Sequence, residues 1–231
     1  MSKVWLIAKR LLWQNRWLFL LLMLWPYGMA VLLLAGGKPD PDDVLWMLHQ
    51  ECFAGLALVA VTGSTLLGNE LRSRRIVTVL SRAVSRPMYL FALLVAAWIP
   101  LVLYASGFLI SGVALARAIH QSWGGVLVML LLQLVPGVWA GAISIFWSVL
   151  FPPLIASLFS IACIALAAYG SILSLPGPSR LLASLFQITV SGTNAPKTIW
   201  LDAAVTLAAG AVWFAAASWI FSRRDLNLAA D

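Results

Sequence analysis

The sequence predicts an all-α polytopic membrane protein with six transmembrane helices. Of its 231 residues, 62% are hydrophobic and only 10% are charged, whereas soluble domains carry about a quarter charged residues. The apolar residues form long uninterrupted runs, while the strands of a membrane barrel would alternate apolar and polar residues. Helices that cross a bilayer fit both observations.

A transmembrane helix needs about 20 apolar residues, and six segments of this chain meet that requirement. The predicted spans are residues 17–36, 45–67, 89–113, 124–149, 151–172 and 200–221. We expect one transmembrane domain over 1–231, with spans 1–2 in 17–67, a cytoplasmic loop at 68–88, spans 3–5 in 89–172, an outer segment at 173–199, span 6 in 200–221 and a tail at 222–231.

Residues 1–16 are predicted to form a helix in the inner membrane interface. Lys3 and Arg10 are seven residues apart, as are Lys9 and Arg16, so each pair shares one helical face. Such a face turns its cations towards anionic lipid, which makes membrane lipid an expected partner. The alternative is a cytoplasmic extension of the first span.

The positions of the basic residues predict the orientation. Eleven of the 15 Lys and Arg residues fall in the N-terminal segment, the 68–88 loop and the tail. Cytoplasmic loops carry an excess of Lys and Arg. We therefore expect a multi-pass protein of a bacterial-type inner (plasma) membrane with both termini in the cytoplasm. This distribution also accounts for the net charge of +7, so no nucleic-acid partner is expected.

Residues 173–199 are too apolar for an ordinary loop. Apolar side chains in this segment recur at the spacing of a short amphipathic helix; they are Leu181, Leu182, Leu185, Phe186 and Ile188. We expect a re-entrant segment that enters the outer leaflet or caps the outer mouth without crossing the membrane.

Two polar features lie inside the predicted spans. His49 and Glu51 enter the second span near its outer end, and ionisable residues at such positions are candidates for function. Two roles stay open for them: a structural or interface role, or part of a substrate path or proton site. Small residues also recur in the second and fourth spans, which predicts close helix packing within one subunit, the alternative being a subunit interface; they are Gly55, Gly63, Gly68, Gly137 and Gly141.

Motifs of catalysis are missing from the sequence. It contains no G-x-x-x-x-G-K-[ST], no G-x-S-x-G and no H-E-x-x-H. We therefore expect no catalytic residue, no bound cofactor and no metal in this chain, and any ATP would bind to another protein.

The 68–88 loop is the most informative segment. It reads GNELRSRRIVTVLSRAVSRPM, with arginines at 72, 74, 75, 82 and 86. Ile76, Val79 and Leu80 lie between these arginines, which favours a short amphipathic helix that meets a partner. The alternative is that the arginines only anchor the loop against lipid.

Two stretches of this loop, GNELR at 68–72 and LSRAVSR at 80–86, resemble the cytoplasmic loop of permease subunits of type 2 ABC exporters. In that family an acidic residue and arginines precede a short coupling helix, and a Leu-Ser…Val-Ser-Arg stretch opens the third span. The six spans, the interfacial helix and the tail FSRRDL at 221–226 fit the same pattern.

The resemblance implies a homodimer that works with two separate ABC ATPase subunits, which would bind ATP and Mg²⁺. The residues it assigns to ATPase coupling are Glu70, Arg72, Arg74, Arg75, Ile76, Val79, Leu80 and Ser81. It further implies ATP-driven export of a hydrophobic or amphipathic substrate along a path lined by the second and fifth spans. The competing interpretation is a membrane anchor or scaffold of a multi-protein assembly with no transport of its own.

Overall fold

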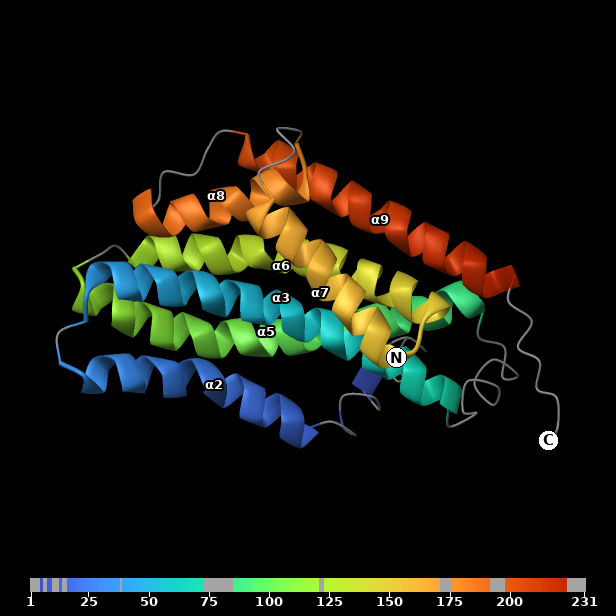
Figure 1. Ribbon diagram of the computed structural model, residues 1–231, viewed down its shortest axis with the longest axis horizontal. Coiled ribbons are helices and arrows are strands. Elements are labelled where there is room, and N and C mark those ends of the chain that lie inside the picture. The colour runs from blue at the N-terminus through green and yellow to red at the C-terminus, as the bar shows by residue number, and fades with distance from the viewer. Residues whose placement is uncertain are drawn as a thin grey trace.

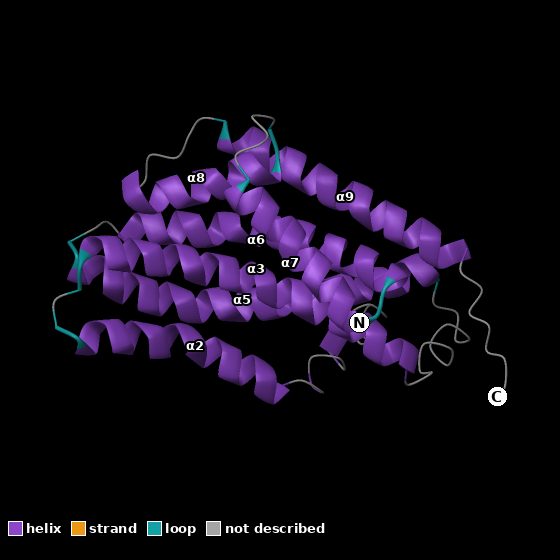
Figure 2. Ribbon diagram, in the orientation of Figure 1, coloured by secondary structure: helices purple, strands orange, loops and turns teal. Residues whose placement is uncertain are grey.

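A computed structural model describes residues 5, 8–9, 13, 16–37, 39–72, 85–120, 123–170, 176–191 and 198–223. Within these residues the regular structure is helical throughout (Figure 2). The all-α prediction is therefore confirmed for the part of the chain that is described.

The structure contains seven helices in the described residues. They are α2 (Arg16–Ala35), α3 (Pro41–Arg72), α5 (Arg86–Ala118), α6 (Trp123–Leu150), α7 (Pro153–Tyr169), α8 (Pro178–Ser191) and α9 (Ile199–Arg223).

Four of these helices are long and apolar enough to cross a membrane: α3, α5, α6 and α9. They contain the predicted second, third, fourth and sixth spans, and they identify the chain as a multi-pass membrane protein with four candidate spans. The helices α2 and α7 occupy the positions of the first and fifth predicted spans. Their crossing of the membrane, and hence the count of six, stays a prediction.

The helix α6 lies at the centre of the bundle. It packs against α3, α5, α7, α8 and α9, and Figure 1 shows α3 and α5 running beside it with α9 on the far side. Two thirds of its most apolar window is buried, against 22% for α9. The helix α2 packs mainly against α5 at the opposite edge, so its outer face is left to lipid or another protein.

Glycines allow the close helix contacts within the subunit. A side chain at Gly63 would collide with Ser144 of α6, and one at Gly68 would collide with the Pro153 ring that opens α7. A side chain at Gly141 would likewise collide with Leu94 of α5. The prediction that these small residues serve packing within one chain is confirmed.

The amphipathic helix predicted in the outer segment is present as α8. Leu181, Leu182 and Leu185 are buried where α8 packs against α6, α7 and α9. The placement of this segment in the outer leaflet remains a prediction, as does the interfacial helix at 1–16, most of which falls outside the described residues.

Candidate functional site

Two helices meet at the points where the arginine-rich segment leaves and rejoins the bundle. Glu70 lies in the last turn of α3 and Tyr89 in the first turn of α5. The Tyr89 hydroxyl donates a hydrogen bond of 3.2 Å to Oε2 of Glu70, and both residues are buried. Pro87 in the first turn of α5 fixes a helical backbone angle at the start of the helix, and so positions Tyr89 three residues into it.

Arg86, the first residue of α5, joins this junction to α9. Its guanidinium donates hydrogen bonds of 3.0 Å to the carbonyl of Phe221 and 2.8 Å to the carbonyl of Ser222. Carbonyls at the C-terminus of a helix lack partners within the helix and carry partial negative charge. The arginine supplies both donors and a compensating positive charge.

We call Glu70, Tyr89, Arg86 and the C-terminal turn of α9 the junction. Through these contacts the ends of α3, α5 and α9 are connected directly beside the arginine-rich segment. A force on that segment would therefore reach three helices at once. Of the predicted coupling residues, Glu70 is part of the junction and Arg72 is the last residue of α3. The others, Arg74, Arg75, Ile76, Val79, Leu80 and Ser81, lie outside the described residues.

A second polar cluster lies deep between α3, α5 and α6. Glu51 is 3% exposed, and the Tyr104 hydroxyl donates to its carboxylate and to its backbone carbonyl. Gln133 is fully buried in α6. Its Nε2 donates a hydrogen bond of 2.8 Å to the carbonyl of Cys52. Its Oε1 has no hydrogen-bond partner. Because a side chain on Gly55 would lie 2.6 Å from Gln133 Nε2, the cluster is tightly packed.

The structure separates the two residues predicted together in the second span. Glu51 is directed into the cluster, whereas His49 is half-buried two positions earlier, and residues two apart do not share a helical face. Glu51 does not reach the surface, because Tyr104 and the packed helices cover it. This geometry favours the structural role among the two left open by the sequence.

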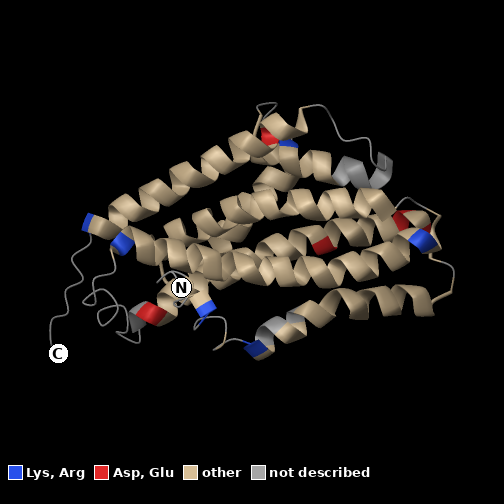
Figure 3. Cartoon of the chain, turned by 180° about the vertical axis from the view of Figure 1, so that it is seen from behind, with Lys and Arg blue, Asp and Glu red and all other residues tan. Residues whose placement is uncertain are grey.

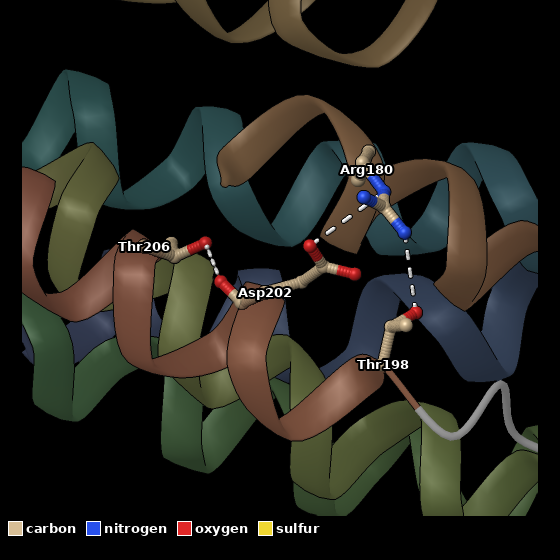
Figure 4. A network of polar contacts seen from close by, with 4 residues as sticks. All are labelled: Arg180, Thr198, Asp202 and Thr206. Atoms are coloured by element: carbon tan, nitrogen blue, oxygen red, sulfur yellow. Dashed lines mark hydrogen bonds and ion pairs between the residues drawn. The ribbon is translucent and has the colours of Figure 1, made fainter. Parts of the chain in front are cut away.

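A third polar contact was not predicted. Nε of Arg180 in α8 lies 3.7 Å from Oδ1 of Asp202 in α9, and the Asp202 side chain is fully buried. Arg180 also reaches the Thr198 hydroxyl at 3.3 Å, while the Thr206 hydroxyl donates to the Asp202 carbonyl (Figure 4). Neither carboxylate oxygen of Asp202 has a hydrogen bond, so the ion pair with Arg180 is the contact that offsets burial of its charge. The sequence shows only one basic and one acidic residue in two successive, largely apolar segments, which does not by itself indicate a pair.

The distribution of charge matches a membrane bundle. Figure 3 shows the described charged residues gathered mostly towards the ends of the helices. Among the described residues, no group of three His, Cys, Asp or Glu side chains is arranged to hold a metal ion.

Comparison with known proteins adds no assignment. Neither the models of known protein families nor the curated protein sequences contain a match to this chain.

Proposed function

We propose that this chain is the transmembrane permease subunit of an ATP-driven exporter and works as a homodimer with separate ABC ATPase subunits. The observation that carries the proposal is the junction beside the arginine-rich segment. Glu70, the acidic residue of the GNELR stretch, is bonded to α5, and Arg86, the last residue of the LSRAVSR stretch, is bonded to α9. A partner that pushes on the segment would thereby move α3, α5 and α9 together.

The relative lengths of the helices support this role. Met23 of α2 packs against Gly107 of α5, so Arg16 at the start of α2 lies beside the middle of α5, near Pro100. The remaining residues of α5 down to Arg86 extend roughly 20 Å further. In the proposed orientation the junction, at the ends of α3, α5 and α9 where the arginine-rich segment leaves the bundle, would lie on the cytoplasmic side, where a soluble ATPase could reach that segment.

The substrate would be hydrophobic or amphipathic. The helices proposed to line its path, α3 and α7, pack against each other, and α7 exposes large apolar side chains such as Leu154, Leu158 and Leu166. In the proposed dimer this face would turn towards the second copy. ATP and Mg²⁺ would be held by the ATPase and not by this chain.

The test is co-expression with each candidate P-loop ATPase of the same genome, followed by affinity purification and assay of ATP hydrolysis in liposomes. We expect one ATPase to co-purify with the wild-type chain and to be lost on Leu80→Asp. His120→Asp is the matched control, because His120 is exposed in the turn that follows the opposite end of α5, and it should retain the ATPase. Retention of the ATPase by Leu80→Asp would contradict the proposal. A stable partner without ATP-dependent turnover would instead support the scaffold interpretation.

A further inference from the structure

An apolar cavity of about 360 Å³ lies where the N-terminal segment meets α2 and α5. Trp5, Lys9 and Trp13 line it from the N-terminal segment, together with Arg16 at the start of α2. Leu20, Met23 and Leu103 close it from α2 and α5. The volume falls within the range of roughly 300–1,000 Å³ that is usual for small-molecule sites.

The polar rim of this cavity comes from one helical face. Trp5, Lys9 and Trp13 are four residues apart and Arg16 follows three residues later, which places all of them on one side of a helix. Trp5, Lys9 and Trp13 are indeed helical in the structure. Tryptophan and cations on one face are typical of a helix that lies in the membrane interface.

The charge of Arg16 is held at the rim by aromatic rings. Its guanidinium carbon lies 4.6 Å from the ring centre of Trp13 and 5.3 Å from that of Trp17. Contacts of this length are within the range of a cation–π interaction. Lys9 and Arg16 are both exposed, and none of the described residues that line the cavity is acidic. The site therefore combines an apolar interior with a rim of two positive charges.

The position of the cavity along α2 fits a membrane boundary. The helix has 20 residues, which corresponds to about 30 Å, the thickness of the hydrocarbon core. Arg16, as its first residue, would then lie at headgroup level, while Leu20, Met23 and Leu103 lie further towards the acyl chains.

We propose that this cavity binds one anionic phospholipid of the surrounding bilayer. An acyl chain occupies the space between Trp5, Trp13, Leu20 and Leu103, and the phosphate lies beside Lys9 and Arg16. Only a ligand with both an apolar chain and a negative headgroup satisfies the whole site. The assignment does not depend on the proposed transport function.

Native mass spectrometry of the delipidated full-length protein in detergent tests this assignment. Equal amounts of phosphatidylglycerol and phosphatidylcholine are added, and the lipid retained per protein is measured. We expect the wild type to retain phosphatidylglycerol preferentially. Lys9→Gln with Arg16→Gln should weaken its apparent affinity about tenfold or more, because each basic residue near an anionic headgroup contributes to binding.

Matched variants separate charge from fold. Lys9→Arg with Arg16→Lys keeps both charges and should retain phosphatidylglycerol, and so should Arg117→Gln, which removes a cation at the other end of α5. Leu103→Trp fills the apolar interior and should reduce retention. The assignment would be overturned by equal retention of the two lipids, by wild-type binding in the Gln variant, or by full displacement with soluble glycerol phosphate at the same concentration.

Discussion

Tyr89 at the start of α5 donates a 3.2 Å hydrogen bond to Oε2 of Glu70 at the end of α3, across 19 residues of sequence. The arginine-rich segment lies in the interval between them. This bond joins the departure and return points of the segment, and Arg86 extends the connection to α9. The segment is thus attached to the bundle at a defined and buried point.

Removal of the Tyr89 hydroxyl should weaken this attachment. Tyr89→Phe keeps the ring packing and deletes a hydrogen bond to a carboxylate, which typically contributes about 1.5–3 kcal/mol. We expect a loss of about 1–2 kcal/mol in the free energy of unfolding, measured by denaturant titration in detergent micelles. Tyr27→Phe on α2 removes a hydroxyl far from the junction and should change stability little. Equal stability of the two variants would show that the junction contributes nothing.

Substitution of Arg86 should loosen the end of α9. Arg86→Gln removes the positive charge and the Nη1 group that donates to the carbonyls of both Phe221 and Ser222. Fraying of the last turn then becomes easier because its carbonyls lose their partners. Hydrogen exchange in the final turns of α9 should become faster, with α8 unaffected. Arg86→Lys should give an intermediate rate, and a wild-type rate in Arg86→Gln would contradict the contact.

The contact between Gly68 and Pro153 predicts a steric effect on α3 and α7. The proline ring is rigid, so Gly68→Ala must displace one helix against the other, and overpacking of this kind costs typically 1–3 kcal/mol. Gly28→Ala in α2 is the matched control, because nothing lies within 4 Å of the added methyl group. It should be neutral or stabilise by roughly 0.5–1 kcal/mol, as Ala is a better helix former than Gly. Thermal unfolding distinguishes the two, and a neutral Gly68→Ala would argue against the packing of α3 on α7.

The Arg180–Asp202 pair predicts a specific pattern of double substitution. Arg180→Gln leaves Asp202 buried without its cation, which destabilises proteins by up to about 3–5 kcal/mol. Arg180 is itself about one third exposed, at 37%, so we expect a smaller loss of about 1–3 kcal/mol. Adding Asp202→Asn removes the buried charge and should restore part of that stability. Additive losses in the double variant would show that the pair is not coupled.

The packing around Glu51 predicts that the shape of its side chain and its hydrogen-bond acceptor contribute more to stability than its charge does. Glu51→Gln retains an oxygen that accepts the Tyr104 hydroxyl, and we expect stability and ATP-driven turnover in liposomes to remain close to wild type. Glu51→Leu removes the side-chain acceptor and should destabilise by about 1–3 kcal/mol. A loss of turnover in Glu51→Gln at unchanged stability would instead place Glu51 on a substrate or proton path.

The local features of the fold could be predicted from the sequence because they depend on neighbouring residues. The apolar runs gave the long helices, and the spacing of Leu181, Leu182 and Leu185 gave α8. The predicted limits of the helices were less accurate. The second span was predicted to end at residue 67, whereas α3 continues to Arg72. Helical hydrogen bonds do not stop where hydropathy falls, and the bond from Tyr89 holds Glu70 in the last turn.

The candidate site was only partly predictable, because its contacts join residues distant in sequence. Arg86 was identified as a cation of the loop, but its partners on α9 lie 135 and 136 residues away. Gln133 stands alone in an apolar span, and only the approach of α3 at Gly55 reveals that it bonds the Cys52 carbonyl. Asp202 and Arg180 lie in separate apolar segments of the sequence, and nothing local indicates that they pair.

Labelling of Ser81→Cys tests directly on which side of the membrane the arginine-rich segment lies. The native thiols would first be removed by Cys52→Ala and Cys163→Ala, and a membrane-impermeant maleimide applied to intact cells and to inside-out vesicles. We predict labelling in the inside-out vesicles and none in intact cells. Labelling of intact cells would place the segment outside, where no ATP-binding subunit could reach it, and would contradict the proposed function.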